Sequence, residues 1–306
     1  MTARRARLAV ALALPVALAL EVPSDASQRP RPRSYASVIT QIRQRRVKEL
    51  KADDGWLTVA GLFWLKPGVN SAGSARTSDI RLPAKAPLNL GVFELKDGRV
   101  TFRAASSAHV TVGGKRLETG AIEAPMDDAG ALASGDLRLF VIRRDDRVAV
   151  RMRDLRSATR TGFTALRFYT ARRSYRVRAR FVPYDHPRQV PVPNVLGQAP
   201  EMTSPGYVTF SLRGARLRLE PVYETDENKD LFFIFKDGTS GDTTYGAGRF
   251  LHAPLPRGGI VTLDFNQAYN PPCAFTDFAT CPLPTKQNRL AVRIEAGELA
   301  YRIHPE

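Results

Sequence analysis

The chain has 306 residues and a formal net charge of +16, from 46 Lys and Arg against 30 Asp and Glu. This length can bury a substantial core and suits one large or two ordinary domains. Such a charge would favour nucleic acid as a partner, but the basic residues are spread along the chain and lie beside acidic ones, so we predict no nucleic-acid binding. The favoured interpretation is a solvated, arginine-rich surface, and the alternative is one that binds acidic glycans or anionic lipid headgroups.

Residues 1–27 are predicted to be a signal peptide and its lead-in. Arginines at positions 4, 5 and 7 precede an apolar run at residues 8–20, and Ala17-Leu18-Ala19 offers a cleavage site after Ala19. The run is shorter than the roughly 20 residues of a spanning helix, and no later stretch comes closer, so we predict no membrane span. An uncleaved anchor is the less favoured alternative. We expect a periplasmic or secreted protein.

Residues 28–52 are predicted to be a linker followed by an amphipathic helix. Between residues 34 and 51, apolar side chains recur at helical spacing, at Tyr35, Val38, Ile39, Ile42, Val47 and Leu50. The basic outer face could lie on a membrane, but docking of the helix against the following domain is the preferred interpretation.

Residues 53–184 are predicted to form a β-sandwich unit. After an apolar block at residues 56–65, short strands separated by turn signals are expected at 91–95, 100–104, 109–112, 137–143, 148–152, 163–169 and 175–184. The strand order from Leu65 to Val141 resembles that of forkhead-associated sandwiches. The resemblance implies architecture only, because Ser74 follows Gly73 where those phosphopeptide readers carry an arginine, and residues 87–91 contain no Ser or His.

Residues 185–306 are predicted to be a second β-rich unit. The proline-rich segment between Tyr184 and Gly206 marks the boundary, and strands are expected at 207–212, 217–223, 231–235, 260–265 and 290–294. The predicted fold is therefore mainly β, with one N-terminal helix, a β-sandwich and a second β unit.

Familiar catalytic and metal-binding motifs are absent from the sequence. The four histidines lie far apart without metal-ligand spacing, and no Gly-x-Ser-x-Gly, Ser-x-x-Lys or Walker motif occurs. We therefore predict no metal site and no cofactor.

The segment from Leu231 to Leu283 holds the densest set of polar and aromatic residues. Its candidate ligand-binding residues are Asp237, Thr239, Thr244, Tyr245, Arg249, Asp264, Asn266, Tyr269 and Asn270. In one interpretation Asp264 and Asn266 meet Arg249 and Tyr245, so that Arg249 clamps a carboxylate or phosphate while Asp264 serves as base or metal ligand. In the other, Asp264 forms a buried ion pair with Arg249 and the remaining residues support turns. The two interpretations are about equally supported.

Seven residues separate the only two cysteines, Cys273 and Cys281. A disulfide across this short loop suits an exported protein and would contribute ~2.5 kcal/mol, so it is the first choice. A metal pair lacks further ligands nearby apart from His252, and a catalytic thiol lacks an adjacent base.

Several segments together resemble the DUF1684 family, a bacterial and archaeal group of unknown function. They are GLFWLKPGVNSAGS, RMRD, DGTSGDTTYGAGRFL, LDFNQAYNPPCAF, ATCPLP, NRL and IEAGE, and the resemblance spans roughly Ser34 to Glu298. The resemblance implies that the family has a signature made of the following residues: Thr244, Tyr245, Arg249, Asp264, Asn266, Tyr269, Asn270, Cys273 and Cys281. It implies no activity, and cytoplasmic relatives argue against an obligatory disulfide.

The sequence thus favours an exported protein that binds a small molecule or an acidic glycan around Arg249 and residues 264–270. One alternative is a hydrolase that uses Asp264 with Arg249 and Tyr245. Another is a structural or envelope-interaction protein. No oligomeric state is predicted.

Overall fold

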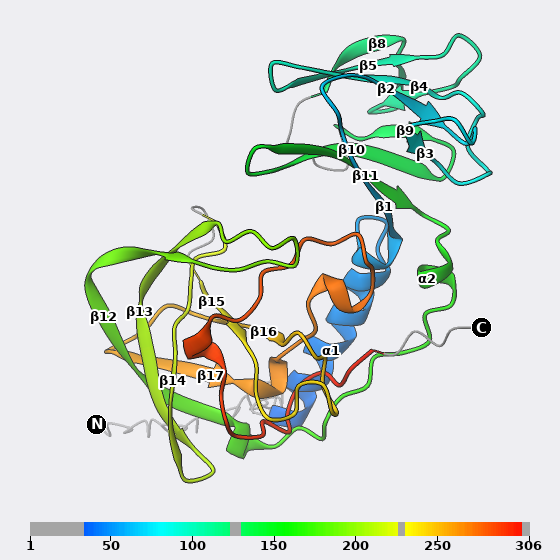
Figure 1. Ribbon diagram of the computed structural model, residues 1–306. Coiled ribbons are helices and arrows are strands. Elements are labelled where there is room, and N and C mark those ends of the chain that lie inside the picture. Colours follow the sequence, from blue (N-terminus) through cyan, green and yellow to red (C-terminus); the bar gives the residue numbers. More distant parts are fainter. Residues whose placement is uncertain (1–33, 123–129, 226–229, 302–306) are drawn as a thin grey trace, which may run out of the picture. The chain divides into compact units, whose positions relative to one another are not determined.

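The computed structural model describes residues 34–122, 130–225 and 230–301. The chain divides into two compact units, Met1–Ser34 and Tyr35–Glu306, and the elements below belong to the second. The predicted signal peptide and its cleavage site lie outside the described residues. Figure 1 shows the fold as mainly β with one long helix, which confirms the predicted class.

Helix α1 (Tyr35–Lys51) confirms the predicted helix and buries Ile39 and Leu50. Leu50 belongs to a small apolar cluster with Leu57, Phe163 and Phe275. Tyr35 at the start of the helix and Arg46 near its end bond to residues beyond 260. The helix therefore docks mainly on the C-terminal part of the chain rather than on the sandwich that follows it. No helix among the described residues is long and apolar enough to cross a membrane.

A β-sandwich follows, as predicted. The helical turn η1 (Trp56–Thr58) leads into β1 (Val59–Trp64), β2 (Gly68–Gly73), β3 (Ile80–Arg81), β4 (Gly91–Lys96), β5 (Arg99–Ala104), β6 (Thr111–Val112), β7 (Lys115–Arg116), β8 (Thr119–Ile122), β9 (Leu132–Ser134), β10 (Leu137–Arg144) and β11 (Arg147–Asp154). One sheet has the order β1-β11-β10-β9-β6-β7 and the other β3-β2-β4-β5-β8. Both contribute to one apolar core, with Phe93 and Phe102 from the second sheet and Leu139 and Val150 from the first.

A second sheet system begins after helix α2 (Ala158–Thr161) and the turn η3 (Arg173–Tyr175). Strands β12 (Arg176–Pro191), β13 (Glu201–Leu212), β14 (Ala215–Leu219) and β17 (Ile260–Asp264) form a sheet in the order β14-β13-β12-β17. Strands β15 (Leu231–Phe235) and β16 (Arg249–Ala253) form a separate pair. Inward-facing residues of these strands share one apolar core, in which Phe210, Phe233, Leu251 and Leu263 are buried.

The predicted domain boundary between residues 184 and 185 falls inside β12. This strand pairs with β13 and β17, so it belongs to the C-terminal sheet from its first residue. Two of the prolines that suggested a linker, Pro187 and Pro205, lie at an irregularity, because the register between β12 and β13 shifts between Pro183 and Arg188. A proline without an N–H is tolerated at such a bulge.

Two predicted strands do not form in the structure. Residues 163–169 form no strand and contribute one isolated bridge, from Phe168 to Glu298. Residues 290–294 also form no strand. Leu290 and Val292 bond to the backbone of Lys236 and Gly238, but the Ile294 N–H and C=O bond to the side chains of Asp237 and Arg249. Strand β16 was not predicted, and three short turns, η4 (Phe265–Gln267), η5 (Pro272–Ala274) and η6 (Lys286–Asn288), shape the C-terminal loops.

Candidate functional site

The nine predicted site residues lie in separate networks rather than in one cluster. Asp237, Thr239, Thr244 and Arg249 share a buried network. Asp264 and Asn266 meet at the start of α1. Tyr269 and Asn270 lie near the C-terminal end of α1, where they contact Arg46. Tyr245 donates a hydrogen bond to the carbonyl oxygen of Cys273 at 3.0 Å.

Arg249 pairs with Asp237, which corrects the predicted pairing with Asp264. Its Nη2 lies 2.6 Å from Oδ2 of Asp237, and both side chains are completely buried. The guanidinium also donates to the carbonyl oxygens of Ile294 (3.0 Å) and Ala296. Because every surface of Arg249 is covered, the side chain has no access to a ligand from solvent and instead joins two segments of the core.

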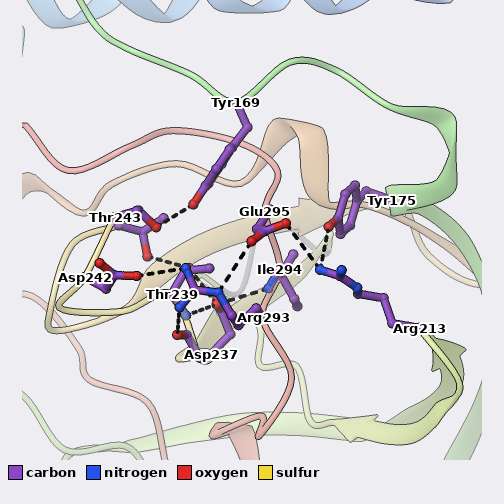
Figure 2. A network of polar contacts seen from close by, with 12 residues as sticks. Tyr169, Tyr175, Arg213, Asp237, Thr239, Asp242, Thr243, Arg293, Ile294 and Glu295 are labelled. Carbon is purple, nitrogen blue, oxygen red and sulfur yellow. Dashed lines mark hydrogen bonds and ion pairs between the residues drawn. The ribbon is translucent and has the colours of Figure 1, made fainter.

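Asp237 organises the loop that follows β15. Its Oδ1 accepts hydrogen bonds from the Thr239 N–H (2.7 Å), the Thr239 hydroxyl (2.6 Å) and the Ile294 N–H (3.3 Å). Figure 2 shows this network and its outer part, where Arg293 reaches Asp242 at 2.8 Å and Glu295 at 3.4 Å. The inner part of this network, around Asp237 and Arg249, is buried and holds the loop in place.

Asp264 and Asn266 anchor the first residue of α1. The Tyr35 hydroxyl donates to Oδ1 of Asp264 at 2.9 Å, and Nδ2 of Asn266 donates to that hydroxyl at 2.7 Å. Asn266 also bonds to both backbone groups of Arg172. Burial, and then the bond to Asp264, raise the pKa of Tyr35, so this hydroxyl keeps its proton and remains a donor. Asp264 therefore positions the helix, and the predicted trio of Asp264, Arg249 and Tyr245 does not form.

Cys273 and Cys281 are both free thiols in the structure. The Cys273 N–H donates to Sγ of Cys281 at 3.1 Å. A hydrogen bond between the two thiols lowers the pKa of Cys273 and raises that of Cys281. The side chains are thus neighbours, and the disulfide stays a prediction.

A pocket of about 300 Å³ lies beneath α1. The helix contributes Ile42, Arg43, Arg45, Arg46 and Glu49 to its wall. The opposite wall consists of Phe168, His252 and residues 266–269, which include the predicted Asn266 and Tyr269. The helix wall carries three arginines and one carboxylate, that of Glu49, so its net charge is positive.

Arg43 and Arg46 are held by the pocket's own walls. Arg43 lies 4.5 Å from the Phe168 ring and donates to the Tyr169 carbonyl at 2.8 Å, while its buried Nε has no hydrogen-bond partner. Arg46 lies 4.7 Å from the Tyr269 ring and donates to the Asn270 carbonyl at 2.9 Å. Both guanidinium groups are therefore held in fixed positions, and Arg43 keeps one donor free.

A chain of hydrogen bonds runs from Asp230 through His252 to Tyr269. Nδ1 of His252 lies 2.9 Å from Oδ2 of Asp230, and Nε2 lies 2.9 Å from the Tyr269 hydroxyl. The Asp230 carboxylate accepts a hydrogen bond from the Nδ1–H group, so Nε2 accepts a hydrogen bond from the Tyr269 hydroxyl. Burial raises the pKa of Tyr269, which keeps the phenol protonated. The chain of hydrogen bonds therefore fixes the orientation of the His252 and Tyr269 rings at the pocket wall.

The sequence did not single out Arg43, Arg46, Asp230 or His252 as site residues. Arg43 and Arg46 lie one helical turn apart, so the spacing predicts a shared face, but not what that face covers. His252 was considered only as a metal ligand. The described residues contain no group of three or more His, Cys, Asp or Glu side chains that could hold a metal ion.

Glu298 is a fully buried carboxylate next to the pocket. Its Oε2 accepts the Asn270 N–H at 2.5 Å, and Oε1 lies 3.5 Å from Nε of Arg46. Burial raises the pKa of Glu298, and the nearby Arg46 guanidinium limits the rise. The folded state therefore holds this proton more tightly than the unfolded state.

We expect Glu298 to make folding stability depend on pH. Its contribution is fully present below the ordinary pKa of a glutamate and is lost as the pH rises through the raised folded value. The stability of the wild type relative to Glu298→Gln should therefore fall as the pH rises above the ordinary glutamate value of about 4.5. Urea denaturation at a series of pH values measures the change. Glu118→Gln, at an exposed position, is the control, and an equal slope for both variants would contradict the assignment.

Comparison with known proteins places the chain among relatives of unknown function. The family described as "Protein of unknown function (DUF1684)" matches residues 161–299. A solution NMR structure of an uncharacterized protein from gene locus rrnAC0354 of Haloarcula marismortui is 31% identical and covers 46% of this chain and 78% of that one, with a TM-score of 0.39. The chain belongs to the DUF1684 family. No curated protein matches it.

The matched part of this DUF1684 protein is shorter than the span expected from the sequence. The match begins at residue 161, inside α2, and therefore leaves out α1 and the sandwich. It includes His252, Tyr269 and Glu298, whereas the pocket arginines of α1 lie outside it. The pocket thus combines the DUF1684 segment with a helix that precedes it.

Proposed function

We propose that this protein binds a small anionic molecule in the pocket beneath α1. The observation that carries the proposal is the cationic wall formed by Arg43, Arg45 and Arg46, with the Arg43 Nε buried and without a partner. Guanidinium groups bind carboxylates and phosphates through charge-assisted hydrogen bonds, and an unmade bond of a buried donor is costly. An anion in the pocket would be attracted by the three guanidinium groups that line it.

The size and chemistry of the pocket narrow the class of ligand. A volume of about 300 Å³ lies at the lower end of the range for small-molecule sites. Ile42, Phe168 and the ring of Tyr269 offer apolar surface beside the arginines. The favoured ligand is therefore a metabolite-sized carboxylate or phosphate with a compact apolar body, whereas a glycan chain is too large to be enclosed here.

A ligand screen on Arg43→Met tests this proposal. Methionine keeps an unbranched apolar stem over Phe168 and removes the charge and the free donor. Thermal unfolding is measured with small dicarboxylates, sugar phosphates and single uronic acids. A ligand present at about 100 times its Kd stabilises the wild type by about 2.7 kcal/mol, and we expect Arg43→Met to lose most of that gain.

Lys48→Met is the matched control for the screen. Lys48 lies on the same helix and is exposed, but it does not line the pocket. This variant loses the same charge and should keep the ligand-induced shift. An equal loss in both variants would show that only overall charge matters, and an unchanged shift in Arg43→Met would overturn the proposal.

We further propose that the protein acts outside the cytoplasm. The support is the predicted leader with its cleavage site after Ala19 and the proximity of the two cysteines. Intact-mass measurement of the protein from a periplasmic extract tests both points. A chain that starts at Leu20, with a mass that rises by two hydrogens on reduction, is expected. An uncleaved chain contradicts the leader, and an unchanged mass on reduction contradicts the disulfide.

A further inference from the structure

One face of the sheet β14-β13-β12-β17 carries a regular arrangement of exposed arginines. Thr209 in β13 pairs with Arg218 of β14 on one side and with Arg180 of β12 on the other. Two residues further along β13, Ser211 pairs with Arg216 of β14, and Arg178 precedes Arg180 by two residues in β12. We call Arg178, Arg180, Arg216 and Arg218 the arginine grid.

The geometry of a β-sheet fixes the spacing of this grid. Residues two apart along a strand lie about 7 Å apart on the same face, and strands two positions apart are separated by about 10 Å. The opposite face is apolar, with Ala179, Phe210 and Leu217 in the core. Because side chains alternate between the two faces, the sheet itself holds all four guanidinium groups outward, with hydroxyl side chains between the two columns.

The arginine grid lacks the carboxylates that accompany arginines elsewhere. Arg160, Arg213 and Arg293 pair with Asp53, Glu295 and Asp242 on the surface. In contrast, Arg178, Arg180 and Arg216 form no ion pair or hydrogen bond among the described residues, so their mutual repulsion is not compensated locally.

The carboxylates at the rim of the grid have other partners. Asp264 bonds to Tyr35 and lies 3.9 Å from Arg176, outside the grid. Glu220 is buried and accepts the Tyr184 hydroxyl at 2.6 Å. Neither forms an ion pair with the four arginines, so within the described part of the chain the positive charge of the grid is not paired.

Two tyrosines border the arginine grid at one end. The guanidinium of Arg218 lies 3.7 Å from the centroid of the Tyr207 ring, and its Nη2 donates to the Tyr184 hydroxyl at 3.3 Å. The rings of Tyr184 and Tyr207 lie 6.0 Å apart. The two contacts fix the position of Arg218, and the adjacent hydroxyls of Tyr184, Thr209 and Ser211 are suited to polar groups between charges.

We propose that the arginine grid binds a linear acidic polysaccharide whose carboxylates repeat along the chain. Repeated guanidinium groups match repeated carboxylates, and the interleaved hydroxyls match sugar hydroxyls. An open sheet face also accommodates an extended chain that the small pocket cannot enclose. The grid residues do not line the pocket, so this site is independent of the proposed small-ligand site.

The test measures binding of the full chain to fluorescent oligogalacturonates. We expect the Arg→Thr variant of all four grid arginines to bind at least about tenfold more weakly, equivalent to about 1.4 kcal/mol, and with a shallower salt dependence. Threonine suits exposed strand positions and therefore preserves the sheet. Far-UV circular dichroism and the melting temperature establish that the variant is folded.

A control variant removes the same charge from strands of the sandwich, with Thr at the exposed positions Arg81, Arg99, Arg103 and Arg116. It should bind oligogalacturonate within about twofold of the wild type. An equal loss in the control would overturn the proposal, because binding would then follow net charge alone. Tighter binding of a single-stranded oligonucleotide with the same number of charges would overturn the choice of partner. Arg43→Met should leave binding to the grid unchanged.

Discussion

Replacing Arg249 with methionine is expected to destabilise the protein by about 3–5 kcal/mol. Arg249 and Asp237 form an ion pair with both side chains fully buried, so the variant leaves the Asp237 carboxylate without its counter-charge. The change also removes donors from the carbonyls of Ile294 and Ala296, at the place where the C-terminal segment has no neighbouring strand. Urea denaturation followed by far-UV circular dichroism measures the loss.

The double variant Arg249→Met with Asp237→Asn separates the charge from the packing. Asparagine keeps an oxygen for Thr239 and removes the charge that Arg249 balances. We expect the double variant to lose less than the sum of the single variants, with a coupling of about 1–3 kcal/mol. Additive losses would show that the pair does not act as a unit.

Arg156→Met supplies the comparison at the surface. Arg156 pairs with Asp136 at 3.3 Å, but both side chains are exposed to solvent. An exposed pair contributes about 0.2–1 kcal/mol, so this variant should change stability little. A loss below about 1 kcal/mol for Arg249→Met would contradict the assigned role of the buried pair.

The predictions that succeeded rest on strong local patterns. The apolar spacing of residues 35–50 gave α1, and the continuous apolar run LFFIF gave β15 with the observed bounds. The segment at 290–294 also alternates, but the backbone groups of Ile294 are bonded by the side chains of Asp237 and Arg249, which are more than 40 residues away. Local sequence patterns do not predict such long-range bonds to side chains. They also do not show that a segment rich in proline is paired with distant strands, as β12 is.

The candidate site was predicted only in part, because its parts are distant in sequence. Asn266 and Tyr269 were named and do line the pocket, yet the arginines that make it cationic lie more than 200 residues earlier, on α1. Asp237, Asp264 and Arg249 were all expected in one place, and the sequence could not choose Arg249's partner. The choice depends on where the loop after β15 folds back, which is a property of the tertiary structure.

Gly297→Ala is expected to destabilise the protein by about 3 kcal/mol or more and to weaken ligand binding in the pocket. Gly297 has a φ of +82°, in the left-handed region, and an added Cβ would lie 2.4 Å from the Ala268 carbonyl oxygen and 2.9 Å from that of Phe265. Both contacts are with backbone, so no side chain can move aside. The Glu298 N–H bonds to the same Ala268 oxygen at 2.8 Å.

Gly214→Ala measures the part of this loss of stability that comes from the left-handed backbone conformation alone. Gly214 has a φ of +81°, but an added Cβ there meets no atom within 4 Å, so its cost is the left-handed strain of about 1–2 kcal/mol. The excess for Gly297→Ala therefore measures the close approach of two backbone segments beneath the pocket. A displacement of the backbone at residues 268 and 298 would shift the side chains of Tyr269 and Glu298. Tyr269 is hydrogen-bonded to His252, and Glu298 is ion-paired with Arg46, so both pocket residues would lose their fixed positions. Equal losses in the two variants, with ligand binding retained in both, would show that the pocket does not depend on this contact.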